Sequence, residues 1–206
     1  DGVAHTAFTL GGVKYGRTYF VSRDRDVMLI RLTVDRPGAL SFTARLSRVA
    51  QATVSADGDA LWMSGQLSSG NPDKVGMKYC VAMRLVSKSG TVSVSPEKGI
   101  SLKDGQEAWL LLSAATSFVA EGTAFPGDRY MEVCDSLLNA VDEESAMEQS
   151  HIAAHRALYD RVSLTLPSSP DDTLPTNERL LRFVDNPSPG LAALYYNYGR
   201  YLLISS

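Results

Sequence analysis

The sequence predicts a mainly β protein, in which an antiparallel β-sandwich is followed by α-helices. Residues 1 to about 118 form short runs of alternating apolar and polar residues, separated by turns rich in Gly and Asp. From about residue 127 onward the apolar residues recur with the spacing of a helix instead. The chain has only two cysteines, so a disulfide framework does not hold the fold together.

The alternating runs predict the strands one by one. Two runs around Gly11-Gly12 predict a hairpin. In the run 26–35, one face carries Val27, Leu29, Arg31 and Thr33. The other face is wholly apolar, with Met28, Ile30, Leu32 and Val34, and is expected to contact the core. Further strands, with turns that include Asp57-Gly58 and Asp104-Gly105, are expected at 39–48, 60–66, 75–87, 90–95, 99–103 and 107–118, the last buried on both faces.

The remaining pattern predicts helices at about 127–146 and 145–159, a short strand at 161–166 and a loop at 167–175. Thr176 is the expected N-cap of the next helix, with Glu178 in its first turn. Ser188 and Pro189 predict the start of a last helix. Its apolar stripe is too broad to be covered by the helices in this chain and comprises Leu191, Leu194, Tyr195, Tyr198, Tyr201 and Leu202.

Composition excludes several classes of protein. The net charge of -3 and the lack of a basic run interleaved with aromatics argue against nucleic-acid binding. No apolar stretch is long enough for a membrane span, and no signal peptide is recognisable. Cys80 and Cys134 are interpreted as buried free thiols, with a single bridge between them as the alternative. The pattern at both ends predicts that the chain is an excerpt from a longer protein.

The segment "HIAAHRALYDRV" places His151 and His155 on one face of a helix, as in zinc hydrolases. Position 152 is Ile where such enzymes need a Glu, and no third ligand is evident, so we expect both rings to pack in the fold and bind no metal. No nucleophile elbow is present. The acidic clusters at 24–26, 142–145 and 171–172 are expected to lie in turns or at helix ends, where acidic side chains favour solvation and capping. No catalytic, cofactor-binding or metal-binding residue is therefore assigned.

Five segments, in this order, resemble signatures of glycoside hydrolase family 95, the α-L-fucosidases and related α-L-galactosidases of bacteria. They are "YGRTYFVSRDRDVMLIRLTVDRPGALSFTARLSR", "LLLSAATSF", "HIAAHRALYDRV" with the following "SLTL", "LPTNERLLRF" and "LAALYYNYGRYLLISS". The resemblance covers about 13–206 and is weakest at 49–74 and 120–145. It implies an incomplete supersandwich-like β-sandwich at 1–125, a helical linker at 126–187 and the first, truncated helix of an (α/α)6 catalytic barrel at 188–206.

The resemblance also implies a function. The intact protein would be an inverting, exo-acting hydrolase that removes terminal α-L-fucose or α-L-galactose from glycans, without a cofactor, in the periplasm or outside a bacterial cell. Its catalytic carboxylates would lie beyond residue 206, so this chain alone is expected to be inactive. The alternative is a carbohydrate-binding or structural sandwich, in which Trp62 would be a stacking platform, whereas Trp109 is expected in the core. The sequence does not determine the oligomeric state.

Overall fold

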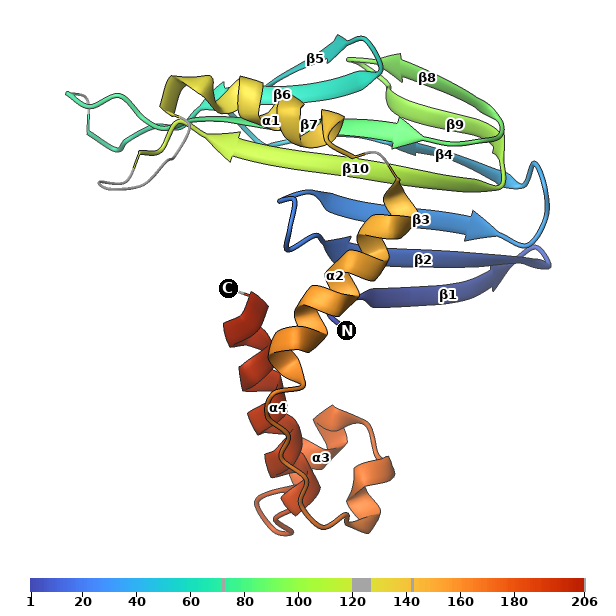
Figure 1. The fold of residues 1–206 in the computed structure, drawn as a ribbon, viewed down its shortest axis with the longest axis vertical. Helices are drawn as coiled ribbons and strands as arrows, with labels where there is room; N and C mark the ends of the chain where they lie inside the picture. Colours follow the sequence, from blue (N-terminus) through green and yellow to red (C-terminus); the bar gives the residue numbers. More distant parts are fainter. Residues whose placement is uncertain (72, 120–126, 142, 206) are drawn as a thin grey trace. The chain divides into compact units, whose positions relative to one another are not determined.

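The computed structural model describes residues 1–71, 73–119, 127–141 and 143–205 and confirms the predicted fold class. Strands come first and helices follow (Figure 1). The strands are β1 (Ala4–Leu10), β2 (Val13–Val21), β3 (Met28–Val34), β4 (Leu40–Ala44), β5 (Thr53–Asp57), β6 (Ala60–Gln66), β7 (Lys78–Val86), β8 (Thr91–Ser95), β9 (Gly99–Gly105) and β10 (Glu107–Thr116). Of these, β5 is the one strand that the sequence pattern did not predict.

The strands form two antiparallel sheets. One has the order β1-β2-β3-β10-β7-β6-β5 and the other the order β4-β9-β8. The β1–β2 hairpin turns at Gly11 and Gly12, which have φ of 58° and 75°, the conformation that a two-residue turn between twisted strands requires. Strand β10 pairs with β3 on one side and β7 on the other, so it lies in the middle of the larger sheet.

The larger sheet has a hydrophobic core on each of its faces. The core against the smaller sheet contains Val34, Leu61, Met83, Leu85, Ile100, Leu102 and Leu110. The core on the opposite face contains Leu29, Trp62, Cys80, Trp109, Leu111, Cys134 and Leu138. The sheet is therefore the middle layer of three, with the helix α1 (Tyr130–Asn139) over its second face (Figure 1).

This arrangement corrects one prediction about β3. The wholly apolar face does contact a core, but Ile30 and Leu32 are only partly buried there. The other face carries Leu29, which is fully buried beneath the helical layer together with the neighbouring Val27. From the sequence, the face with Arg31 and Thr33 was expected to be exposed to solvent, so only one core was predicted. In the structure a helix from far along the chain covers part of that face.

The turn predicted at Asp104-Gly105 is a second correction. Both residues belong to the end of β9, and Asp104 has φ of 58°. The pairing register of β4 and β9 shifts between Leu40 and Phe42, which is the signature of a β-bulge. A left-handed residue followed by Gly serves a bulge as well as a turn, so the sequence pair alone does not distinguish the two.

The first helical segment is shorter than predicted. In place of one helix over 127–146, a 3-10 turn η1 (Gly127–Arg129) precedes α1, which ends at Asn139. The helix α2 (Glu144–Tyr159) then begins, close to the predicted start. Val141 follows the end of α1 but still packs on the same core as Leu138, so the apolar spacing continues across the break and conceals it.

The chain divides into two compact units. One comprises Val3–His151 and the other comprises Asp1–Gly2 with Ile152–Ser206, so the division falls within α2. The second unit also contains the 3-10 turn η2 (Pro170–Thr173), α3 (Thr176–Arg182) and α4 (Pro189–Ser205). Among the described residues, no helix is both long and apolar enough to cross a membrane.

Two predictions for the second unit are wrong. Residues 161–166 form no strand: no described strand pairs with them, and the carbonyl of Leu164 accepts a hydrogen bond from Asn197 Nδ2 at 3.3 Å instead. Thr176 is not the N-cap of α3 but its first residue. Pro175 occupies the cap position, and its carbonyl accepts the first helical bond, from the N–H of Glu178 at 3.0 Å.

Candidate functional site

The two histidines of α2 are buried, and each packs against an aromatic ring. Within the first unit, His151 stacks on Phe20, with ring centroids 5.1 Å apart. Within the second unit, His155 stacks on Tyr159 at 5.4 Å. No group of three or more His, Cys, Asp or Glu side chains that could hold a metal ion occurs in the part of the chain that the structure describes. The histidines therefore have packing roles in these surroundings.

Both tryptophans belong to the core beneath α1, which confirms the prediction for Trp109 and decides the open case of Trp62. The guanidinium of Arg31 lies 5.3 Å from the centre of the Trp109 ring. The carboxylate of Glu107 accepts hydrogen bonds from Arg31 Nε at 2.9 Å and from Trp109 Nε1 at 3.2 Å. Both indoles are buried, with exposed fractions of 8% for Trp62 and 6% for Trp109.

A groove of about 470 Å³ lies where β3, β7 and β10 meet the start of α2. Its lining includes apolar side chains, among them Val34 and Val86, together with Lys88, Gln106 and the carboxylates of Glu107, Glu143 and Glu144. Glu107 is held by Arg31 and Trp109, and Glu143 accepts a hydrogen bond from Ser145 Oγ at 2.9 Å. These contacts hold the carboxylates of Glu107 and Glu143 against neighbouring side chains.

The other acidic clusters also make structural contacts. In the cluster 24–26, Asp24 accepts a hydrogen bond from Ser150 Oγ at 2.6 Å, and Asp26 has φ of 52° in the turn before β3. In the cluster 142–145, position 142 lies outside the described residues. The third cluster, at 171–172, is the most connected of the three and organises the second unit.

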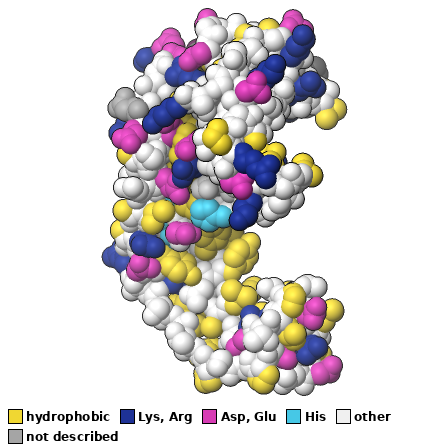
Figure 2. Space-filling model, turned by 90° about the vertical axis from the view of Figure 1, so that its right-hand side faces the viewer, with side chains coloured by type: hydrophobic (Ala, Val, Ile, Leu, Met, Phe, Trp, Pro, Cys, Tyr) yellow, Lys and Arg dark blue, Asp and Glu magenta, His cyan; other side chains and the backbone are white. Residues whose placement is uncertain are grey.

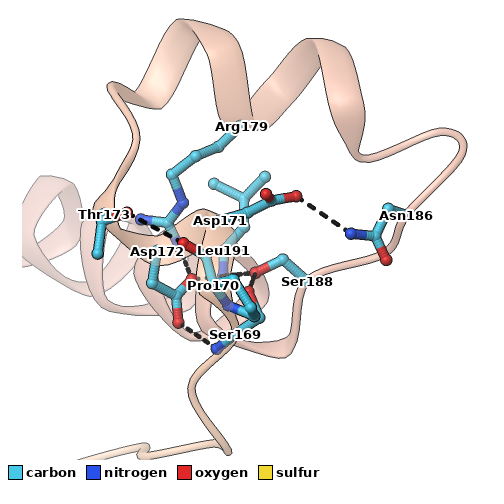
Figure 3. Close-up of polar contacts among 9 residues, drawn as sticks. All are labelled: Ser169, Pro170, Asp171, Asp172, Thr173, Arg179, Asn186, Ser188 and Leu191. Atoms are coloured by element: carbon cyan, nitrogen blue, oxygen red, sulfur yellow. Dashed lines mark hydrogen bonds and ion pairs between the residues drawn. The ribbon is translucent and has the colours of Figure 1, made fainter.

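The carboxylate of Asp172 joins three segments of this unit (Figure 3). It accepts hydrogen bonds from the backbone N–H of Ser169 at 2.9 Å and from Ser188 Oγ at 3.1 Å, and it forms an ion pair with Arg179 of α3. Arg179 is only 8% exposed, which is uncommon for a charged side chain and is tolerated because the carboxylate is its counter-ion. We call Ser169, Asp172, Arg179 and Ser188 the Asp172 cluster.

The Asp172 cluster also caps α4. Ser188 Oγ accepts the N–H of Leu191 at 3.2 Å, so Ser188 is the N-cap that the sequence predicts. Gly190 is in the first turn of α4, and a Cβ at that position would lie 2.3 Å from Asp172 Oδ2. Beside the cluster, Asp171 accepts hydrogen bonds from Arg182 at 3.2 Å and Asn186 at 3.1 Å. The acidic pair thus fixes the start of the last helix.

These contacts lower the pKa of Asp172 below its ordinary value. The main cause is the hydrogen bond from the Ser169 N–H, and Ser188 and the charge of Arg179 act in the same direction, while desolvation opposes them. A carboxylate with a lowered pKa stabilises the fold above its unfolded pKa of about 3.9, and this contribution disappears as the pH falls through the lower, folded pKa.

We therefore expect part of the acid-induced loss of helix in the second unit to depend on Asp172. Circular dichroism between pH 5 and pH 2 should show an acid transition in the native chain that is weakened in Asp172→Asn, because that variant has lost the stabilisation already at pH 5. Asp160→Asn, a change at an exposed aspartate, is the matched control. Identical acid transitions in all three proteins would contradict this assignment.

The last helix leaves most of its apolar stripe exposed. Leu191 and Ala193 are buried near the start of the helix, and farther along it Asn197 donates to the Leu164 carbonyl while the Arg200 guanidinium lies 4.6 Å from the centre of the Tyr159 ring. Hydrophobic side chains are visible on the surface that α3 and α4 form (Figure 2). On α4 the exposed ones reach 79%, at Tyr195, and include Leu194, Tyr198, Tyr201, Leu202 and Leu203. A surface of this kind is typical of an interaction site.

Two families match the chain in succession. Residues 1–121 match the glycosyl hydrolase family 65 N-terminal domain, and residues 143–206 match the glycosyl hydrolase family 95 catalytic domain. Together they define the chain as glycoside hydrolase sequence. Because the first match covers more than half of it, the chain belongs to the family of glycosyl hydrolase family 65 N-terminal domains. The second match confirms the predicted resemblance to family 95.

Curated relatives agree with this assignment. The chain is 27% identical to "Alpha-L-fucosidase 2" of Arabidopsis thaliana over 99% of its own length and 28% of the relative. It is 28% identical to "Probable alpha-fucosidase A" of Aspergillus niger over 74% of its length and 20% of the relative. The chain thus spans less than a third of the length of these proteins.

Among solved structures, a putative kojibiose phosphorylase from the human microbiome has a similar fold. The TM-score is 0.50 at 8% identity, over 77% of this chain and 22% of that one. The likeness concerns the fold alone.

Sequence reasoning located the acidic pair at 171–172 and the cap at Ser188 but not the contact between them. The spacing offers a weak signal, since Arg179 follows Asp172 by seven residues within a short helical segment. The cluster forms because a loop, α3 and the start of α4 converge, and such convergence has no fixed spacing in the sequence.

Proposed function

We propose that this chain is the N-terminal part of an inverting, exo-acting family 95 glycoside hydrolase that removes terminal α-L-fucose, or α-L-galactose, from glycans. The observation that supports the proposal is the order of the two family matches, a family 65 N-terminal domain at 1–121 followed by a family 95 catalytic domain match at 143–206. The names of the two relatives support fucose as the sugar. In this proposal, residues 1–125 are the sandwich, 126–187 the linker and 188–206 the first helix of the barrel.

The exposed stripe of α4 supports the assignment of that helix to a larger helical domain. Burial of each Leu or Tyr side chain stabilises a fold by roughly 1.5–3 kcal/mol, so an exposed row of such residues is costly unless other helices cover it. Of the stripe, Leu191 is buried within its own unit and Tyr201 lies 6.1 Å from the His155 ring, while Leu194, Tyr195, Tyr198 and Leu202 stay exposed. Further helices of the catalytic domain would cover it.

In the proposed reaction, one carboxylic acid protonates the glycosidic oxygen while a carboxylate activates a water on the opposite face of the sugar. The described residues supply structural partners for Glu107, Glu143, Asp171 and Asp172, and none of these contacts forms an acid–base pair across a pocket. We therefore assign the chemistry to the part of the barrel that follows in sequence. We also place the intact enzyme in the periplasm or outside the cell, where glycans are its substrates.

The test is release of L-fucose from 2'-fucosyllactose and aryl α-L-fucosides. The protein that carries this chain together with its barrel should release fucose, and NMR of the first product should show the β-anomer, because the mechanism inverts. The 206-residue chain alone should give no turnover above a buffer blank. Absence of fucose and galactose release by the intact protein would refute the proposed activity. Turnover by the chain alone, lost on changing one Asp or Glu, would refute the assignment of the chemistry to the barrel.

A further inference from the structure

The two cysteines of the chain meet in the core beneath α1. Cys80 lies on β7 and Cys134 on α1, and their sulfur atoms are 2.9 Å apart. Both residues belong to the unit Val3–His151, and their exposed fractions are 1% and 0%. Fifty-four positions separate them in the sequence, so their meeting is produced by the fold.

The surroundings hold the two sulfur atoms toward each other. The carbonyl of Cys134 accepts a hydrogen bond from Ser113 Oγ of β10 at 2.9 Å, which fixes the helix backbone next to the sheet. The sulfurs also contact backbone carbonyls, Tyr130 at 3.4 Å from Cys80 Sγ and Cys80 itself at 3.7 Å from Cys134 Sγ. Both cysteines belong to the same buried core as Trp62, Ala82 and Leu138.

We propose that Cys80 and Cys134 form an intramolecular disulfide that fixes α1 to the larger sheet. The sulfur atoms, free thiols in this structure, need to approach each other by about 0.9 Å to reach the usual bond length of about 2.05 Å.

The reaction is a thiol–disulfide exchange with a low-molecular-weight disulfide such as oxidised glutathione. The thiolate of one cysteine attacks one glutathione sulfur and expels the first glutathione thiolate. The other cysteine then loses its proton and attacks the sulfur of the first cysteine, which expels the second glutathione thiolate. Two protein thiols are oxidised to one disulfide, and one glutathione disulfide is reduced to two glutathione thiols, which take up the two protons.

In the folded unit the Cys80 thiol donates a hydrogen bond to the Cys134 sulfur, which lowers the pKa of Cys134 and raises the pKa of Cys80. Because both sulfurs are buried in the folded unit, the oxidant reacts while α1 is still separated from β7, during folding. The contact between the thiols has not formed at that stage, so it does not decide which thiol attacks first.

The direct test is the mass of the 206-residue chain after refolding with a mixture of oxidised and reduced glutathione. The product is unfolded in an alkylating reagent and then analysed without reductant. We expect a mass 2 Da below that of the reduced chain, no alkylation, and a peptide that joins the segments containing Cys80 and Cys134. Two alkylated cysteines, a glutathione adduct or a disulfide-linked dimer as the main product would overturn the proposal. Because the readout is a mass, its failure is distinct from failure of the proposed hydrolase activity.

A second measurement tests whether the bond stabilises the unit. Reduction with dithiothreitol should lower the Tm of the oxidised chain by about 5–15 °C, since a loop of this length is among those that gain most from cross-linking. In the matched control Cys80→Ala/Cys134→Ala the reductant should leave the Tm unchanged. An equal shift in both proteins, or none in the native chain, would show that the bond does not hold α1 to the sheet.

Discussion

Leu29→Ala is expected to lower the free energy of unfolding of the sandwich unit by about 2–5 kcal/mol, the range for a fully buried leucine. The side chain is fully buried between the larger sheet and the helical layer. Leu32→Ala, three residues along the same strand, removes the same atoms from the opposite face, where the side chain is only partly buried. Its effect should be smaller. Urea unfolding followed by tryptophan fluorescence measures both, because Trp62 and Trp109 are in this unit.

The two variants distinguish the burial seen in the structure from the burial that the sequence pattern predicts. The pattern places Leu32 on the core face of β3 and Leu29 opposite. If Leu32→Ala proved the more damaging of the two, the helical layer would not cover the sheet in solution as it does in the structure.

Gly190→Ala and Gly199→Ala should have opposite effects, although both replace a glycine in α4. Nothing lies within 4 Å of a Cβ at Gly199, so alanine there should stabilise the helix by about 0.8–1 kcal/mol. At Gly190 the new methyl group would lie 2.3 Å from Asp172 Oδ2. The carboxylate must then move away from Ser169, Ser188 and the buried Arg179, which leaves a charged side chain without its counter-ion.

Hydrogen exchange of the backbone amides in α4 reports both changes. Protection should increase in Gly199→Ala and should be lost in Gly190→Ala, first at Leu191, whose N–H is bonded to Ser188 Oγ. Retained protection in Gly190→Ala would mean that the Asp172 cluster does not hold the start of this helix.

The positions of most strands could be predicted from the sequence because alternation and turn residues agree there. Gly11-Gly12 marks a hairpin whose two strands are also neighbours in the sheet, and Asp57-Gly58 marks the turn into β6 although β5 before it was not predicted. The same reasoning identified Ser188 as a cap, since capping is a local interaction. The errors occur where a distant segment decides the outcome. Leu29 is buried by helices that follow about a hundred residues later, and 161–166 has the alternation of a strand but no described partner strand.

The candidate site was less predictable for the same reason. The sequence alone allowed the expectation that His151 and His155 bind no zinc, because the motif of such a zinc site lies within a few consecutive residues. It could not bring Asp172 to Arg179 and Ser188, or Cys80 to Cys134, since these contacts arise only after the chain has folded back on itself.

The central position of β10 has a consequence for how substitutions combine. Ala108 and Leu110 contribute to the core against the smaller sheet, whereas Trp109 and Leu111 contribute to the core beneath α1. Residues adjacent in sequence therefore share almost no packing partners, while residues two apart share many. Double-mutant cycles should show near-additivity between Leu110 and Leu111 and strong coupling between Trp109 and Leu111. In a diverging family, the two sides of this strand are thus free to change their side chains independently of each other.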